Sequence, residues 1–277
     1  MNKQIDIINT IISEAKTYED FKGAPLENIT KIHITVIDNN VEWLGKIIPN
    51  SSNNDIDFEL FLQNSVIDDL LSSDNNKSLF AKSIILHELY HLKEITFTNK
   101  FLNIMPIYNI VKNCTRSMLI HLGYTQWSEY YSHYNSAKYY YSLPELSDCI
   151  NQSEISLTVL KQTLDNESQV QLPEFMYNNI KSFIAKVIKF AAIYNQSKDD
   201  SLLEAIEKYK YGKLYLSHYN FILKIIPYMN TLYQTYPNWI SEEQFLTIGK
   251  ELFSIINDYN MTYSTSNLSD NFIFVSI

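Results

Sequence analysis

Cysteine and arginine are scarce in this chain of 277 residues, which has two cysteines and a single arginine, Arg116. The cysteines, Cys114 and Cys149, lie far apart and form no Cys-x-x-Cys spacing. This arrangement excludes a zinc ribbon and a dithiol redox motif. We expect both thiols to be free, because disulfides are rare in a reducing cytoplasm.

The chain also lacks a strongly basic stretch and a long apolar run. Its formal net charge is −9 and its isoelectric point is about 5.2, so it repels phosphate backbones and we expect no nucleic-acid partner. No stretch reaches the ~18 apolar residues of a membrane span. Near the N-terminus, Ile5, Ile8, Ile12 and Ala15 recur at helical spacing, which predicts an amphipathic helix rather than a signal peptide. We therefore expect a cytoplasmic protein with no membrane partner.

What the chain does have is abundant Lys, Asn, Ile and Tyr, a composition typical of an AT-rich genome and thus of a bacterium or a mobile element. Strand signals are confined to residues 31–63. Residues 32–37 alternate with a period of two, residues 38–40 signal a turn, and a second strand over residues 41–48 ends at Pro49. Residues 56–62 alternate again and predict a third strand.

The pattern becomes helical from residue 77 to about residue 95 and stays helical for most of the remaining chain. Further helices are predicted over residues 106–122, 126–141, 153–164, 173–195, 201–210, 214–235 and 241–257, followed by a strand or docked tail over 272–277. This order predicts an α+β fold. We expect one domain over residues 1–148 and an α-helical region over residues 149–277, either separate or continuous with the first. No signal for an oligomeric state is present.

The most informative motif is His87-Glu88-Leu89-Tyr90-His91, a His-Glu-x-x-His pattern within an apolar helical stretch. Positions i and i+4 of a helix share one face, so the two imidazoles can converge on one ion. Zinc accepts such nitrogens at about 2.0–2.1 Å. Glu88 can reach the metal-bound water without ligating the metal, and there it serves as general base. Burying these groups without a partner is costly, and a metal supplies the partner.

This motif, on an apolar helix that follows a strand-rich segment, resembles the active-site helix of the zincin superfamily of metallopeptidases. The resemblance covers roughly residues 30–140. It implies a small mixed sheet before the helix, zinc as cofactor, a protein or peptide substrate, and hydrolysis of peptide bonds by water that Glu88 activates. It also implies an edge strand that lines the substrate cleft, for which residues 56–62 are the natural choice. Lys93 departs from the apolar residue of many family members.

A catalytic zinc needs a third protein ligand and an open coordination position. Glu94 and Phe97 stand where an extended motif has glycine and a third histidine, so the third ligand must lie further along the chain. Glu129, His133 and His121 are the alternatives, and Glu129 is favoured by its neighbours. Three small residues follow it on the same helical face, which allows close packing against the motif helix: Ser132, Ser136 and Ala137.

A ligand set of two histidines on one helix and a glutamate on a later helix is similar to that of gluzincins. It is also similar to that of the metallopeptidases associated with phage and mobile-element repressors. His133, one turn after Glu129, could orient a ligand or stabilise the developing oxyanion, or it could be a surface histidine.

Two other interpretations of the chain remain. One is a non-catalytic zinc-binding regulatory module on a zincin scaffold, and the other is a helical interaction protein in which the motif arose by chance. The intact Glu88 favours catalysis, because a scaffold that needs only the metal has no chemical use for a base at that position.

Overall fold

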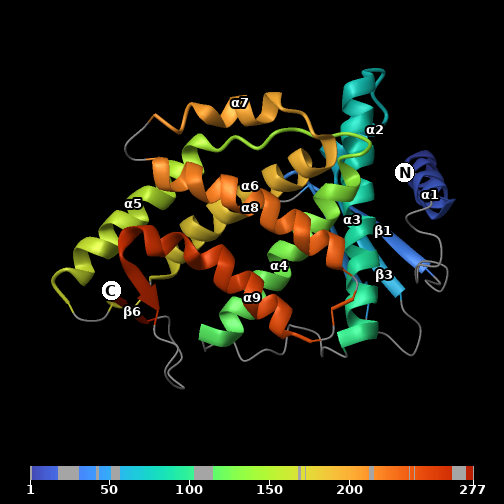
Figure 1. The fold of residues 1–277 in the computed structure, drawn as a ribbon. Coiled ribbons are helices and arrows are strands. Elements are labelled where there is room, and N and C mark those ends of the chain that lie inside the picture. The colour runs from blue at the N-terminus through green and yellow to red at the C-terminus, as the bar shows by residue number, and fades with distance from the viewer. Residues whose placement is uncertain are drawn as a thin grey trace. The chain divides into compact units, whose positions relative to one another are not determined.

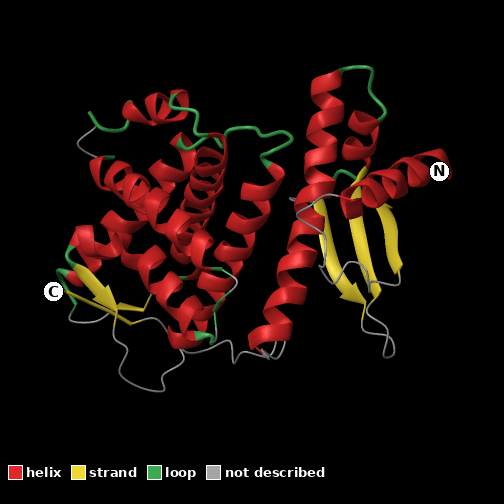
Figure 2. Ribbon diagram, turned by 45° about the vertical axis from the view of Figure 1, so that its right-hand side comes forward, coloured by secondary structure: helices red, strands yellow, loops and turns green. Residues whose placement is uncertain are grey.

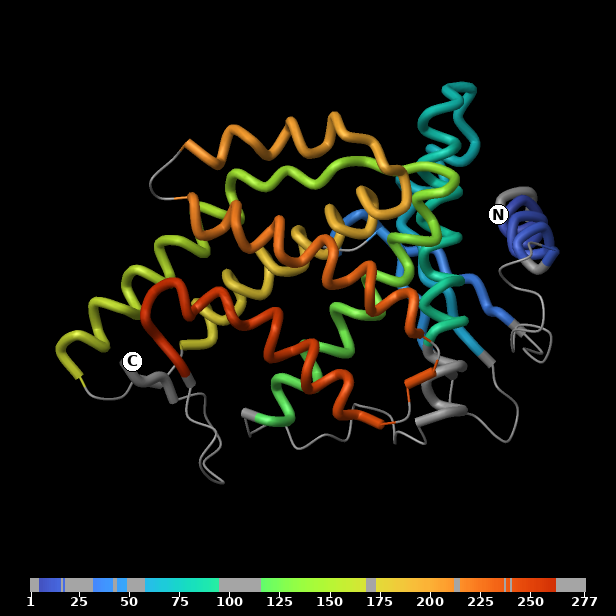
Figure 3. Tube along the Cα trace, in the orientation of Figure 1, coloured from blue at the N-terminus to red at the C-terminus, as the bar shows by residue number. Residues whose placement is uncertain are grey.

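The computed structural model describes residues 2–17, 31–41, 44–50, 57–102, 115–167, 170–171, 173–211, 215–236, 238–239, 241–263 and 273–276 (Figures 1 and 3). Helices predominate and the strands form two small sheets, which confirms the expected α+β class. None of the described helices is long and apolar enough to cross a membrane. Cys149 is a free, buried thiol, and burial raises its pKa to about 11. Cys114 lies outside the described residues.

The chain forms two compact units. Unit 1 comprises residues 1–101 and 131–142, and unit 2 comprises residues 102–130 and 143–277. One continuous helix, α4 (Thr115–Ser136), belongs to both: its first part is assigned to unit 2 and its last turns to unit 1.

The sheet of unit 1 is mixed and three-stranded. It contains β1 (Lys31–Ile37), β2 (Gly45–Asn50) and β3 (Asp57–Gln63) in the order β1-β3-β2. β3 pairs in parallel with β1 and antiparallel with β2, so that Leu60 lies opposite both Ile34 and Ile47. The expectation that the strand at 56–62 forms an open edge was therefore wrong, because β3 is hydrogen-bonded on both sides. Among the described strands of this sheet, β1 and β2 are the edges.

Three helices accompany this sheet: α1 (Asn2–Thr17), α2 (Asn64–Leu70) and α3 (Asn75–Leu102). α1 has the expected amphipathic character, with Ile8 and Ala15 fully buried. α2 follows β3 directly, and the sequence analysis did not anticipate it. The long helix α3 lies beside the sheet (Figure 2) and includes the predicted helix over residues 77–95.

Unit 2 is helical, and Figure 3 follows its chain from α5 to α9. Its helices after α4 are α5 (Ser147–Leu164), α6 (Glu174–Ser197), α7 (Ser201–Glu207), α8 (Leu216–Thr235), α9 (Glu243–Phe253) and the 3-10 helix η4 (Ser254–Tyr259). A small antiparallel sheet joins β4 (Val170–Gln171), β6 (Ile273–Ser276) and β5 (Met261–Tyr263), in that order. The helices predicted after residue 150 are confirmed in position, as is a strand near the C-terminus.

Helix α4 departs most from the sequence expectation. A break between predicted helices over 106–122 and 126–141 is absent, and residues 103–114 lie outside the described part of the chain. Gly123 falls inside the helix because α9 crosses there at backbone contact. A Cβ on Gly123 would lie 1.9 Å from the carbonyl oxygen of Phe245, and one on Gly249 would lie 1.9 Å from that of Leu119. The two glycines thus fix the crossing of α4 and α9.

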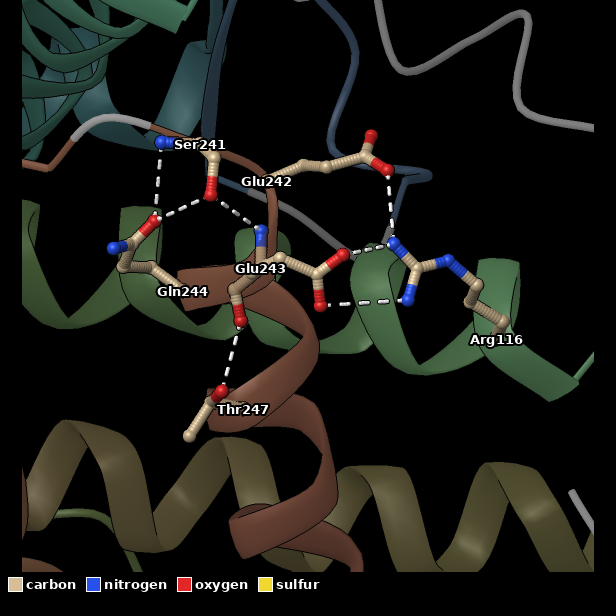
Figure 4. A network of polar contacts seen from close by, with 6 residues as sticks. All are labelled: Arg116, Ser241, Glu242, Glu243, Gln244 and Thr247. Atoms are coloured by element: carbon tan, nitrogen blue, oxygen red, sulfur yellow. Dashed lines mark hydrogen bonds and ion pairs between the residues drawn. The ribbon is translucent and has the colours of Figure 1, made fainter.

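The only arginine holds the same two helices together at the surface (Figure 4). The guanidinium of Arg116, near the start of α4, donates to Glu242 at 3.1 Å and to both carboxylate oxygens of Glu243, at the start of α9. The bonds to Arg116 lower the pKa of the Glu243 carboxyl. The hydroxyl of Ser241, two residues before α9, accepts the backbone amide of Glu243 at 3.3 Å.

Gly249→Ala tests the helix crossing. The added methyl overlaps the backbone of α4, which side-chain rotation does not relieve, so we expect the free energy of unfolding to fall by at least about 2 kcal/mol. Urea denaturation followed by circular dichroism measures it. Thr247→Ala, at an exposed position of the same helix, is the matched control and should change stability by less than about 0.5 kcal/mol. Equal stability of the two variants would contradict the crossing.

A buried polar cluster joins three elements of unit 2. His218 on α8 is fully buried, its ring lies 4.7 Å from that of Phe183, and its Nδ1 lies 3.4 Å from a carboxylate oxygen of Glu154 on α5. Tyr259 of η4 donates its hydroxyl to the same carboxylate. Burial lowers the pKa of His218 to about 4, so the imidazole is neutral near neutral pH.

This burial makes stability depend on pH. Below its ordinary pKa of about 6.5 the unfolded chain binds a proton at His218, whereas the folded chain does not until about pH 4. Unfolding is therefore favoured increasingly as pH falls through this window, by at most about 1.4 kcal/mol per pH unit from this group. Urea denaturation of wild type and His218→Leu across the window measures the difference. Identical pH slopes in the two proteins would contradict the assignment.

Candidate functional site

The two motif histidines face each other on α3. One helical turn separates them, and His87 Nε2 lies 2.9 Å from His91 Nε2. Their rings are nearly perpendicular, with centroids 4.5 Å apart. Both side chains are partly exposed, whereas Leu89 and Tyr90 between them are buried. The helix therefore directs two nitrogen donors toward one point, as the motif spacing predicts.

Glu129 is the third donor at this point. One ligand atom each from His87, His91 and Glu129 all lie within 4.8 Å of one another, and no other such group occurs among the described residues. Glu129 precedes by two residues the part of α4 that is assigned to unit 1.

The donor atoms fit a metal ion. In a tetrahedral site with metal–ligand distances of 2.0–2.1 Å, two ligand atoms lie roughly 3.3 Å apart. The observed 2.9 Å between the imidazole nitrogens needs only a small widening to reach this value. Two neutral imidazoles and one carboxylate are also a ligand set that divalent transition metals accept.

His133 and His121, the alternative third ligands, are not members of this group. The ring centroid of His133 lies 4.3 Å from that of His87, so His133 contacts a ligand side chain. Close packing of α4 on α3 continues at Tyr131, whose ring lies 6.3 Å from that of Tyr90. Ser132 and Ser136 are buried, in line with the small-residue face expected for this helix. His121 lies two turns before Glu129, and burial together with Lys181 lowers its pKa.

Glu88 is turned toward the sheet. Its side chain is 7% exposed, and its Oε2 accepts the backbone amide of Ile47 on β2 at 3.0 Å. The Glu88 side chain also passes beside Gly45, where a Cβ would lie 3.2 Å from Glu88 Cγ. These two β2 residues are not among those predicted from the sequence. A lone glycine in a strand was their only signal, since it often marks a close approach of another group.

Lys189 is a charged neighbour of Glu129 within unit 2. Burial lowers the pKa of Lys189 on α6, and the neighbouring Lys186 lowers it further, whereas the charge of Glu129 opposes both. The Glu129 carboxylate therefore lies within electrostatic reach of a half-buried ammonium group. No pattern in the sequence links these two residues.

The chain matches no protein-family model, no curated protein and no solved structure. The case for a metal centre accordingly rests on the motif and on the geometry of α3 and α4.

Metal affinity tests the donor set. His87→Ala and His91→Ala should abolish stoichiometric metal binding, because each removes one of only two nitrogen donors. Glu129→Ala should weaken binding by more than the 10–100-fold typical of changes outside the ligand shell. Competition with a chromophoric chelator measures these affinities.

His133→Ala and His121→Ala are the matched controls and should bind metal nearly as tightly as wild type. A large loss in His133→Ala together with normal binding by Glu129→Ala would transfer the ligand role from Glu129 to His133.

Proposed function

We propose that this chain is a zinc-dependent metallopeptidase whose metal is held by His87, His91 and Glu129 and whose general base is Glu88. The observation that carries the proposal is the convergence of three donor atoms, two of them from a helix that also carries the buried carboxylate of Glu88, which is not one of the three. When bound, the metal would polarise a scissile carbonyl and acidify a water molecule. Glu88 then takes a proton, which is the contribution expected of a general base.

Zinc is the proposed metal because a carboxylate next to a His-x-x-x-His pair on one helix suits hydrolysis. Two histidines and one carboxylate also suit ferrous iron in oxygenases. Metal analysis of protein purified from cells grown with both metals separates these two chemistries. About one zinc per chain supports the proposal, and iron at the same stoichiometry contradicts it.

A protein or peptide substrate is proposed from the position of β2. The backbone amide of Gln63 donates to the carbonyl of Leu44 at 3.0 Å. Bonded and non-bonded residue pairs alternate along an antiparallel ladder, so the backbone groups of Gly45, Ile47 and Pro49 point away from β3. Proline has no amide hydrogen, as is common on edge strands. The Ile47 amide is bonded to Glu88, and the remaining backbone groups on the open side of this edge strand can pair with an extended peptide.

One observation favours a second candidate, a non-catalytic metal-binding module. Glu88 already accepts a hydrogen bond from Ile47, so this carboxylate has a structural use that does not require catalysis. The two functions differ in whether Glu88 must accept a proton.

Glu88→Gln separates them. The glutamine carbonyl oxygen can still accept the Ile47 amide, so the variant should fold and bind zinc like wild type. It offers no base, so hydrolysis should fall by about 10²–10⁴-fold. Mass-spectrometric detection of new peptide termini in a cell lysate, with wild type and variant added at equal zinc content, measures the difference.

His87→Ala provides the control for cleavage that needs the metal. Termini that appear with wild type and disappear in both variants support the peptidase. A wild type that binds zinc and produces no new termini in lysate or in a random peptide library favours the binding module.

A further inference from the structure

Glu88 lies on α3, but its polar partner comes from strand β2 and not from the helix that carries the motif. The amide of Ile47 points away from β3, as the register of the ladder requires, and donates to Glu88 Oε2 at 3.0 Å. A carboxylate that is 7% exposed loses most of its hydration, so a donor at hydrogen-bond distance is needed to offset the cost. Bonds to an ionised acceptor are also stronger than neutral ones.

Gly45 provides the space for the rest of this carboxylate. A Cβ at Gly45 would lie 3.4 Å from Glu88 Oε1, 3.2 Å from Glu88 Cγ and 3.0 Å from Cγ2 of Ile84. Gly45 is not among the described residues with a positive φ angle, so its conformation does not require glycine. The requirement is steric: β2 passes so close to α3 that a Cβ at position 45 would displace Ile84 and Glu88 by a few tenths of an ångström.

The two carboxylate oxygens of Glu88 therefore have different neighbours. Oε2 is held by Ile47, and Oε1, which lies on the side of Gly45, is the oxygen left to take up a proton. We propose that strand β2 positions the general base, with the amide of Ile47 as the anchor and Gly45 as the gap that admits the carboxylate. The proposal rests on the proposed peptidase function, since Glu88 needs a fixed orientation only if it transfers a proton.

The proposal predicts that a change in β2 lowers the rate of hydrolysis and leaves the zinc affinity unchanged. Neither Gly45 nor Ile47 supplies a metal ligand, so a change at Gly45 should leave zinc affinity within about twofold of wild type. A base displaced by about 1 Å can lose on the order of 10²-fold in rate, so a shift of a few tenths of an ångström should cost several-fold. We therefore expect Gly45→Ala to hydrolyse a quenched-fluorescence random peptide library about fivefold more slowly than wild type.

Ile84→Ala provides the matched control, because Ile84 is the other side chain that a Cβ at position 45 would meet. The single variant should keep its rate within about threefold of wild type. In Gly45→Ala/Ile84→Ala the contact with Ile84 is relieved and the contact with Glu88 stays, so the slow rate should persist. Recovery of the wild-type rate in the double variant would show that Gly45 serves core packing, and it would overturn the proposal.

Hydrogen exchange at the Ile47 amide tests the anchor without reference to activity. In protein labelled with ¹⁵N-isoleucine, the Ile47 signal is assigned by its loss in Ile47→Val, and Ile85 in the middle of α3 reports general unfolding. Glu88→Ala should speed exchange at Ile47 at least tenfold relative to Ile85, whereas Glu88→Gln should keep it protected. Unchanged protection of Ile47 in Glu88→Ala would overturn the proposal.

The two experiments distinguish this proposal from the function on which it rests. A wild type that binds zinc and cleaves nothing contradicts the peptidase, and with it a role for β2 in positioning a base. Cleavage that depends on Glu88, together with a normal rate in Gly45→Ala, leaves the peptidase standing and contradicts positioning by β2.

Discussion

The site depends on one steric constraint: α3 must approach both a strand edge and a second helix closely enough to bury the side chains of a charged motif. Its two histidines need a third donor from α4, and its glutamate needs a donor from β2. Small groups meet both demands. Ser132 and Ser136 on α4 are buried, the ring of His133 lies 4.3 Å from that of His87, and Gly45 lets β2 pass beside Glu88. At this site, close packing of the elements is therefore also what brings the polar side chains to their partners.

Helix α4 carries the third donor, Glu129, and contacts within unit 2 stabilise this helix over several turns before that residue. Within unit 2, Gly123 and Gly249 bring the backbones of α4 and α9 into contact, and Arg116 binds the two acidic residues at the start of α9. The side chain of Asn195 donates to Tyr130 at 3.0 Å and to the carbonyl of Ile226 at 2.7 Å, which ties α4 to α6 and α8. A ligand on a continuous helix is held more precisely than one on a loop.

The sequence predicts those parts of this arrangement that follow from local spacing. The convergence of His87 and His91 is a property of helix geometry, and the small residues after Glu129 indicate a packed face. The break expected near Gly123 is absent because the glycine serves a contact with α9, more than a hundred residues further along the chain. The role of Ile47 is invisible to side-chain patterns, because the interacting group is a backbone amide that every residue except proline carries. The order of the strands likewise depends on a parallel pairing of β1 with β3 that local alternation does not encode.

Glu88 has a role in both proposed functions, the peptidase and the non-catalytic metal-binding module. As a buried carboxylate it needs the Ile47 amide whether or not it ever accepts a proton, so the bond alone does not distinguish a catalyst from a scaffold. The divided use of its oxygens does bear on the choice. A carboxylate kept only for structure would be best served by donors on both oxygens, whereas a base must leave one oxygen accessible to the proton that it takes. Gly45 brings no side chain that could cover Oε1, and the Ile47 amide bonds Oε2. This asymmetry between the two oxygens is what the proposed base requires.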